Sequence, residues 1–169
     1  MKTILKICAV IVGVVLLDQV TKGVLLYLLT ARVPLVAPAW ELVPVPYIMT
    51  QVTDFFRIVF TWNPGASFSL FRALGESAPL AIIIITAVII GLLGQYLFCR
   101  AQTYEKWPLA LVVGGALGNL IDRVRFGAVI DFLDFYIGAW HWPAFNVADI
   151  CIVLGVAGLL FNLIIKRKK

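Results

Sequence analysis

Four long apolar segments dominate this sequence, and they cover approximately residues 4–28, 78–99, 107–126 and 146–165. A helix needs about 20 predominantly apolar residues to cross the hydrocarbon core of a bilayer. Over the whole chain 62% of the residues are hydrophobic and only 14% are charged, and the mean hydropathy of +1.01 is far above that of soluble domains. The sequence therefore predicts an all-α membrane protein with four transmembrane helices, in which residues 1–169 form one membrane-embedded domain.

Basic residues at the segment ends predict the orientation of these helices, because Lys and Arg are enriched in cytoplasmic loops. They gather before the first segment, between the second and third, and after the fourth: Lys2, Lys6, Arg100, Lys106 and 166–169. Both termini are therefore expected in the cytoplasm, and the net charge of +5 indicates topology rather than a nucleic-acid partner. We interpret the first segment as a retained anchor, since Asp18, Gln19 and Lys22 continue its helical pattern where a cleavable signal would end in small residues.

The segment from about 30 to 76 would then lie outside the membrane. Four prolines, Pro34, Pro38, Pro44 and Pro46, break any helix in its first half. Residues 56–62 and 66–71 are rich in aromatic and β-branched side chains, and the sequence Asn-Pro-Gly at 63–65 is typical of a turn. We expect a small β-hairpin or sheet on the outer (periplasmic) surface, with Trp140 and Trp142 in the interfacial aromatic belt.

Two aspartates beside the apolar segments, Asp131 and Asp149, are the leading functional candidates. An ionisable group near hydrocarbon is costly, and neither has a basic residue within one helical turn. Two carboxylates brought together share a proton, because like charges a few Å apart resist joint ionisation. One protonated and one ionised aspartate can polarise a carbonyl and activate a water, which is the chemistry of an aspartic protease.

Further polar residues lie at the same ends of three segments and share helix faces at spacings of three or four: Asp18 and Lys22; Asn119, Asp122 and Arg123; Asn146 and Asp149. These faces should turn inward, since hydrocarbon offers no hydrogen bonds. We expect Asn146 to orient Asp149, and Asn119 and Arg123 to organise the backbone and a bound peptide. The small residues at 114–118, including Gly115, predict close helix packing around the third segment.

Simpler interpretations exist for several of these residues. Asp18 with Lys22, or Asp122 with Arg123, could be ion pairs that hold the bundle together. Asp134 is interpreted as a solvated or interfacial carboxylate, and His141, between two tryptophans, as an interfacial side chain. Cys8, Cys99 and Cys151 lie within or beside apolar runs, so neither a disulfide nor a metal site is expected.

Five blocks of the sequence resemble the lipoprotein signal peptidases, or signal peptidase II: DQVTK at 18–22, NPGASFS at 63–69, GGALGNLIDR at 114–123, VIDF at 129–132 and FNVAD at 145–149. They follow the order of that family over nearly the whole chain. The resemblance implies that Asp131 and Asp149 are the catalytic residues. It implies supporting or substrate-binding roles for Asp18, Lys22, Asn63, Gly115, Asn119, Asp122, Arg123 and Asn146. Ser67 and Thr21 are conservative departures from the family pattern.

The resemblance also implies an activity and a location. Such an enzyme is a multi-pass aspartic endopeptidase of the bacterial inner (cytoplasmic) membrane, with its active site toward the periplasm. It removes the signal peptide from a prolipoprotein by cutting before a diacylglyceryl-modified cysteine, needs no metal or cofactor, and is a target of globomycin. We expect membrane lipids as its surroundings and a monomer as its oligomeric state.

Two other classes of protein fit the residues. A proton-coupled transporter could use Asp18, Asp131 and Asp149 as a relay, although no internal repeat of the kind common in transporters is evident. A non-catalytic assembly subunit could use the same charges only to specify helix pairing.

Overall fold

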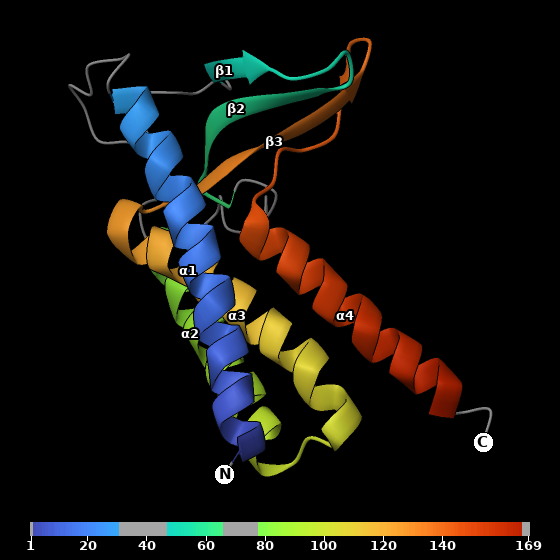
Figure 1. Cartoon of the computed structure of the whole chain (residues 1–169). Coiled ribbons are helices and arrows are strands. Elements are labelled where there is room, and N and C mark those ends of the chain that lie inside the picture. Colours follow the sequence, from blue (N-terminus) through green and yellow to red (C-terminus); the bar gives the residue numbers. More distant parts are fainter. Residues whose placement is uncertain (1, 31–46, 66–77, 167–169) are drawn as a thin grey trace. The chain divides into compact units, whose positions relative to one another are not determined.

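The computed structural model describes residues 2–30, 47–65 and 78–166 (Figure 1). It contains the helices α1 (Lys2–Thr30), α2 (Ala78–Cys99), α3 (Thr103–Phe126) and α4 (Val147–Lys166). The strands are β1 (Tyr47–Gln51), β2 (Phe56–Asn63), β3 (Val129–Ile137) and β4 (Trp140–His141). The chain divides into two compact units, residues 1–19, 84–120 and 147–169 in the first and residues 20–83 and 121–146 in the second.

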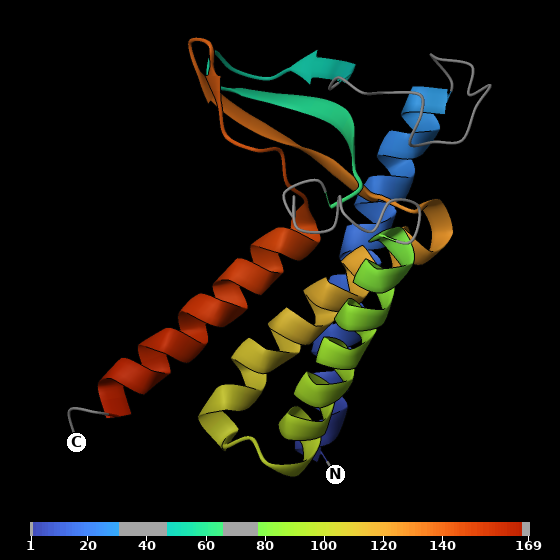
Figure 2. The same ribbon diagram turned by 180° about the vertical axis from the view of Figure 1, so that it is seen from behind.

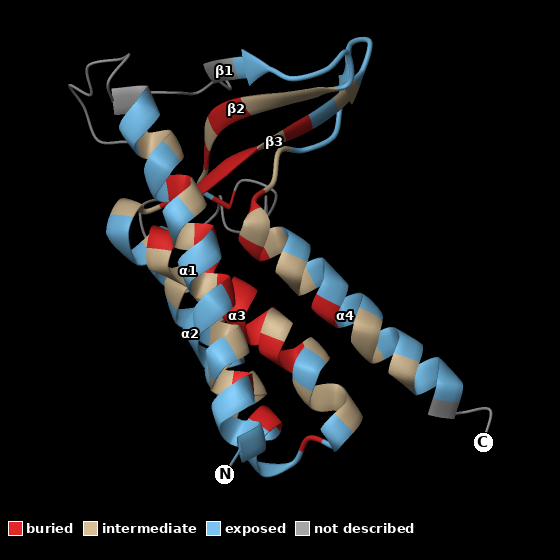
Figure 3. Cartoon of the chain, viewed as in Figure 1, coloured by how far each residue is buried: buried red, intermediate tan, exposed pale blue. Residues whose placement is uncertain are grey.

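Three of the described helices are long and apolar enough to cross a membrane, over Lys2–Leu28, Pro79–Cys99 and Val147–Ile165. Their outward faces carry large exposed apolar side chains, such as Leu92, Phe161 and Leu163, which suits contact with lipid (Figure 3). The membrane-protein character is therefore confirmed for these three. The fourth expected span, 107–126, is helical within α3, but α3 carries charged residues in its first and last turns.

The first unit is a helical bundle whose core includes Ile7, Leu97, Leu109 and Val113. The predicted close packing around α3 is present in this unit. A Cβ added at Gly114 would lie 2.9 Å from Val14 Cβ of α1, and one at Gly115 would overlap the carbonyl oxygen of Ala148 in α4. The two adjacent glycines thus let α3 approach a different helix on each side.

The second unit is built around an antiparallel sheet with strand order β1-β2-β3-β4 (Figure 2). The strand predicted at 56–62 is confirmed as β2, whereas the partner expected at 66–71 lies outside the described residues. Instead β2 pairs with β1 on one side and β3 on the other, with Thr61 opposite Asp131 and Asn63 opposite Val129.

Strand β3 is the main correction to the expected fold, because the sequence predicts β structure only within the segment from about 30 to 76. The pattern VIDFLDFYI places an acidic residue at two of its nine positions, which is unfavourable in an isolated strand. Both carboxylates are buried, Asp131 at 2% and Asp134 at 4% exposure, and both receive hydrogen bonds from other elements. Those partners, which lie far away in the sequence, make the strand possible.

Candidate active site

Asp131 lies on β3 in the second unit, and two asparagine side chains hold its carboxylate. Asn63 Nδ2 at the end of β2 donates to Asp131 Oδ2 over 2.9 Å, and Asn146 Nδ2 donates to Oδ1 over 2.7 Å. Asn146 also donates to the carbonyl of Ile130, and it is fully buried. Each carboxylate oxygen therefore accepts a bond from a different amide, which fixes the plane of the carboxylate.

The local sequence explains how Asn63 reaches this position. Asn63 Oδ1 accepts a hydrogen bond from the backbone N–H of Gly65 over 2.9 Å, which is the turn expected from Asn-Pro-Gly. Gly65 has a φ of 87°, a conformation that strains any residue with a Cβ. The turn holds the oxygen of the amide and leaves its nitrogen directed at Asp131.

Asp149 lies in the first turn of α4, in the first unit, and is half-buried. Asn119 Nδ2 on α3 donates to Asp149 Oδ1 over 2.8 Å. Helical spacing predicts that Asn146 orients Asp149, and Asn119 is expected to organise the backbone and a bound peptide. The structure joins Asn119 to Asp149 and Asn146 to Asp131, and the role of Asn146 toward Asp149 stays a prediction.

Asp18 fixes the start of α4. Its Oδ1 accepts a hydrogen bond from the backbone N–H of Ala148 over 3.0 Å, and its side chain is fully buried. A carboxylate is favourable there, because the first N–H groups of a helix have no intrahelical partner and carry partial positive charge. Gly118 permits this approach, since a Cβ there would lie 2.6 Å from Asp18 Oδ2. Asp18 thus positions the helical turn that carries Asp149.

Lys22 and Asp122 form a buried ion pair in the second unit. Lys22 Nζ lies 2.8 Å from Asp122 Oδ2, with side-chain exposures of 2% and 1%. The same Oδ2 accepts a hydrogen bond from the backbone N–H of Ile130, one residue before Asp131. The pair therefore ties α1 and the end of α3 to the strand that carries Asp131. Arg123 lies next to this pair in the sequence and is half-buried, and its supporting role stays a prediction.

Of the two interpretations of Asp134, as a solvated or an interfacial carboxylate, the solvated one is wrong. Its side chain is buried, Arg57 Nε lies 2.6 Å from its Oδ2, and His141 Nδ1 lies 3.0 Å from its Oδ1. The Arg57 guanidinium also lies over the Tyr136 ring, 5.2 Å from its centroid. Arg57 was not singled out from the sequence. Its position opposite Asp134 in the sheet register could have been recognised only if β3 had been predicted.

The arrangement supports acid–base chemistry. Neutral amides orient a carboxylate through its oxygens while leaving further lone pairs for a water or a shared proton. Within the described residues, no three His, Cys, Asp or Glu side chains come close enough together to form a metal-binding group.

Comparison with known proteins places this chain among membrane enzymes. Two solved structures of a bacterial membrane enzyme, at 1.9 and 2.3 Å resolution, share its fold with a TM-score of 0.70 each. The 1.9 Å structure is 29% identical to this chain, and the match covers 92% of its length. The 2.3 Å structure is 28% identical, and the match covers 87% of its length. Each match covers 94% of this chain. The chain belongs to the signal peptidase II family, since the model of that family matches residues 10–165.

Curated relatives agree with this assignment. A lipoprotein signal peptidase from Desulforapulum autotrophicum is 35% identical over 169 residues, covering 98% of this chain and 96% of the relative. Another from Syntrophotalea carbinolica is 40% identical over 148 residues, covering 87% and 83%. The family makes the chain a peptidase, and the aspartic type fits it. This decides against the transporter and the assembly subunit.

Proposed function

We propose that this chain removes signal peptides from lipoprotein precursors, cutting before a diacylglyceryl-modified cysteine, with Asp131 and Asp149 as the catalytic pair. Family membership and the names of the curated relatives support the substrate class. The observation that carries the choice of residues is the set of amide bonds, two to Asp131 and one to Asp149.

The proposed reaction is a non-covalent hydrolysis. The ionised aspartate takes a proton from a water, whose oxygen attacks the scissile carbonyl. The protonated aspartate donates its proton to the carbonyl oxygen and so stabilises the tetrahedral intermediate. Collapse of the intermediate breaks the C–N bond, and the leaving nitrogen receives a proton from the pair. The amides of Asn63, Asn146 and Asn119 keep the carboxylates oriented through these transfers.

Chain connectivity supports the pairing of the two carboxylates. Asn146 binds Asp131, and Asp149 lies only three positions after Asn146 in the chain. Three extended residues span at most about 10 Å. A catalytic pair that shares one water is compatible with this limit.

Cleavage of a synthetic diacylglyceryl prolipopeptide by the protein purified in detergent tests this function. We expect hydrolysis before the modified cysteine, and slow or no hydrolysis of the same peptide without the lipid. Equal hydrolysis of both peptides, or cleavage at another bond, would contradict the proposed specificity.

We further propose that α3 is a fourth span in the inner membrane of a bacterium. Its 24 residues extend about 36 Å, enough to cross a bilayer. With four spans, both termini lie on the same side of the membrane. The basic residues at the segment ends indicate that this side is the cytoplasm. The sheet and the catalytic pair would then face the periplasm.

Labelling of introduced cysteines should reveal this topology. With the native cysteines replaced by alanine, Thr53→Cys in the exposed β1–β2 turn should react with a membrane-impermeant thiol reagent in spheroplasts. Lys168→Cys should react only after the membrane is permeabilised. The reverse pattern would put the sheet in the cytoplasm and refute the proposed orientation.

Asn63 is expected to be needed for cleavage, because its amide both closes a turn and orients Asp131. Asn63→Ala removes both bonds, and we expect a loss of kcat of about 10²-fold or more with a stability loss of about 1–2 kcal/mol. Asn63→Asp keeps an acceptor for Gly65 but replaces the amide donor by a second carboxylate. Because two carboxylates a few Å apart resist joint ionisation, it should remain strongly impaired in kcat even though the turn bond to Gly65 is kept. Near-normal kcat in Asn63→Asp would show that only the turn matters.

A further inference from the structure

An open aromatic groove lies on the sheet of the second unit. It has a volume of about 460 Å³, and six of its seven lining residues are aromatic, the seventh being Ile137: Phe55, Phe135, Tyr136, Ile137, Trp140, Trp142 and Phe145. Four of these residues are highly exposed: Ile137 at 77%, Trp140 at 60%, Phe55 at 57% and Trp142 at 56%. None of the lining residues is charged, so the groove suits an apolar ligand.

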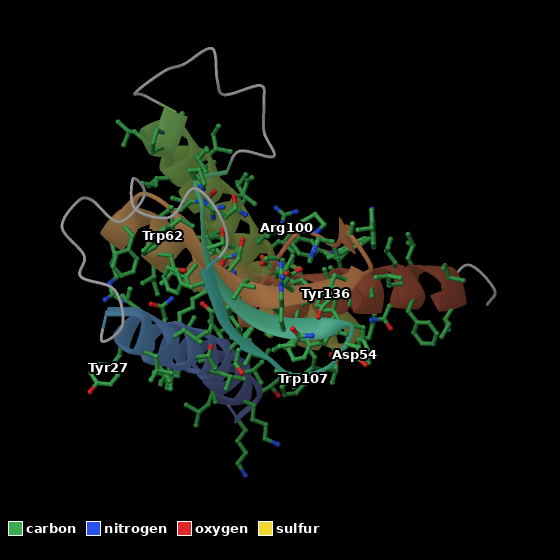
Figure 4. The ribbon with its side chains drawn as sticks, turned by 90° about the horizontal axis from the view of Figure 1, so that it is seen from above. Tyr27, Asp54, Trp62, Arg100, Trp107 and Tyr136 are labelled. Atoms are coloured by element: carbon green, nitrogen blue, oxygen red, sulfur yellow. The ribbon has the colours of Figure 1, made fainter. Side chains whose placement is uncertain are left out.

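The walls of the groove are held by backbone bonds and ring contacts. Trp142 N–H donates to the carbonyl of Phe135 over 2.9 Å, and Tyr136 N–H donates to the carbonyl of Phe55 over 3.0 Å. Phe135 and Phe145 stack with 5.9 Å between ring centroids. Tyr136 thus lies at the same end of the sheet as the β1–β2 turn, which contains Asp54 (Figure 4). These bonds and ring contacts hold the walls of the groove in place, which lowers the entropy cost of binding a ligand.

The alternation of side chains along β3 relates the groove to Asp131. Successive residues of a strand point to opposite faces, so Asp131, Phe135 and Ile137 share one face. Asp134 points to the other face, with its partners Arg57 and His141. This end of the sheet is thus apolar on the face that carries Asp131 and charged on the opposite face.

Distance along the strand then limits what the groove can hold. At about 3.3 Å per residue, Phe135 lies about 13 Å and Ile137 about 20 Å from Asp131. One leaflet of a bilayer contributes about 15 Å of hydrocarbon, and an acyl chain that lies extended in a groove reaches further than a disordered chain in a leaflet. A chain that begins beside Asp131 would therefore end in the groove.

We propose that the groove binds an acyl chain of the diacylglyceryl group on the substrate cysteine. This inference rests on the proposed function, because that function puts the lipidated cysteine at the scissile bond and hence at Asp131. The groove would then distinguish lipidated from unmodified precursors, because an unmodified precursor has no acyl chain to contact the groove. A peptide is a poorer occupant, since the uncharged aromatic lining offers few partners for its backbone.

Cleavage kinetics with long-chain and short-chain diacylglyceryl peptides test the proposal. Ile137→Asn should raise KM for the long-chain substrate about tenfold, by loss of apolar contact, while kcat and the short-chain KM change less than twofold. Ile137→Leu, which keeps an apolar side chain, should have a long-chain KM close to that of wild type. Val52→Asn is the matched control, because Val52 is an exposed apolar residue of the β1–β2 turn that does not line the groove. Equal effects of Ile137→Asn on both substrates would overturn the proposal.

Photocrosslinking gives a second, independent readout. A substrate with a diazirine at the end of its acyl chain should label the peptide that contains residues 133–145, and excess unlabelled substrate should suppress the labelling. Labelling confined to the apolar helices, or equally strong labelling by a diazirine phospholipid, would overturn the groove as a substrate site. If the wild-type protein cleaves no lipidated peptide at all, the proposed function itself fails. Normal cleavage with labelling elsewhere refutes only the groove.

Discussion

Asp131→Asn and Asp149→Asn are each expected to reduce cleavage of a diacylglyceryl prolipopeptide to below about one per cent of wild type. An amide has a similar shape but can neither accept the proton of the attacking water nor share one with the second carboxylate. General acid–base steps contribute about 10²- to 10⁴-fold to a rate, and each variant removes one partner of such a step. Single-turnover kinetics at saturating substrate would measure the loss directly.

The two variants should differ in stability, because the two carboxylates have different partners. Asp131 accepts one amide on each oxygen, so an asparagine there must turn its NH₂ group toward the NH₂ of Asn63 or of Asn146. This conflict should cost about 1–3 kcal/mol. Asp149 is half-buried whereas Asp131 is buried, so an asparagine at 149 can keep its oxygen on the Asn119 amide in a less enclosed site. Asp149→Asn should therefore melt closer to wild type than Asp131→Asn.

Asp54→Asn is a suitable control, since Asp54 is an exposed carboxylate in the β1–β2 turn. It should cleave like wild type. Loss of a general acid–base residue should leave less than about one per cent of wild-type cleavage. Higher activity in a folded Asp131→Asn or Asp149→Asn variant would exceed this residual rate. Such a result would remove that residue from the catalytic pair.

Lys22→Met is expected to be the most destabilising single change. The substitution removes the Lys22 ammonium group, which lies 2.8 Å from the buried Asp122 carboxylate. Breaking one side of a buried ion pair typically costs about 3–5 kcal/mol. Thermal unfolding in detergent should show a strongly lowered Tm or little folded protein.

The double variant Lys22→Met, Asp122→Asn tests the reason for this loss. It removes the buried charge as well as its partner, while the oxygen of the introduced amide can still accept from Ile130 N–H, so part of the stability should return. Lys6→Met provides the control, since Lys6 lies on an exposed part of the same helix and should change Tm little. If Lys22→Met melts like wild type but no longer cleaves, Lys22 acts on the substrate and its structural role is wrong.

Much of the fold follows from local sequence. The span expected at 78–99 matches α2, and the one at 146–165 matches α4 to within one residue at each end. Long apolar runs determine such helices, because hydrocarbon forces the backbone to satisfy its own hydrogen bonds. The turn at Asn63 was also predictable, since its bond to Gly65 spans two residues. Strand β3 was missed, because its buried aspartates depend on Asn63, Asn146, Arg57 and His141.

The sequence by itself determined the apolar helices, the glycine packing of α3 and, apart from Asp134, the polar residues that are buried in the described part of the chain. Only the tertiary structure decided which of them bind one another: Asn146 with Asp131, Asn119 with Asp149, Lys22 with Asp122 and Asp18 with the start of α4. Helical spacing predicts that residues share a face, but several donors then compete for each carboxylate. The donor that binds a given carboxylate is the one that tertiary packing brings to within hydrogen-bond distance. That packing depends on contacts between residues far apart in the chain.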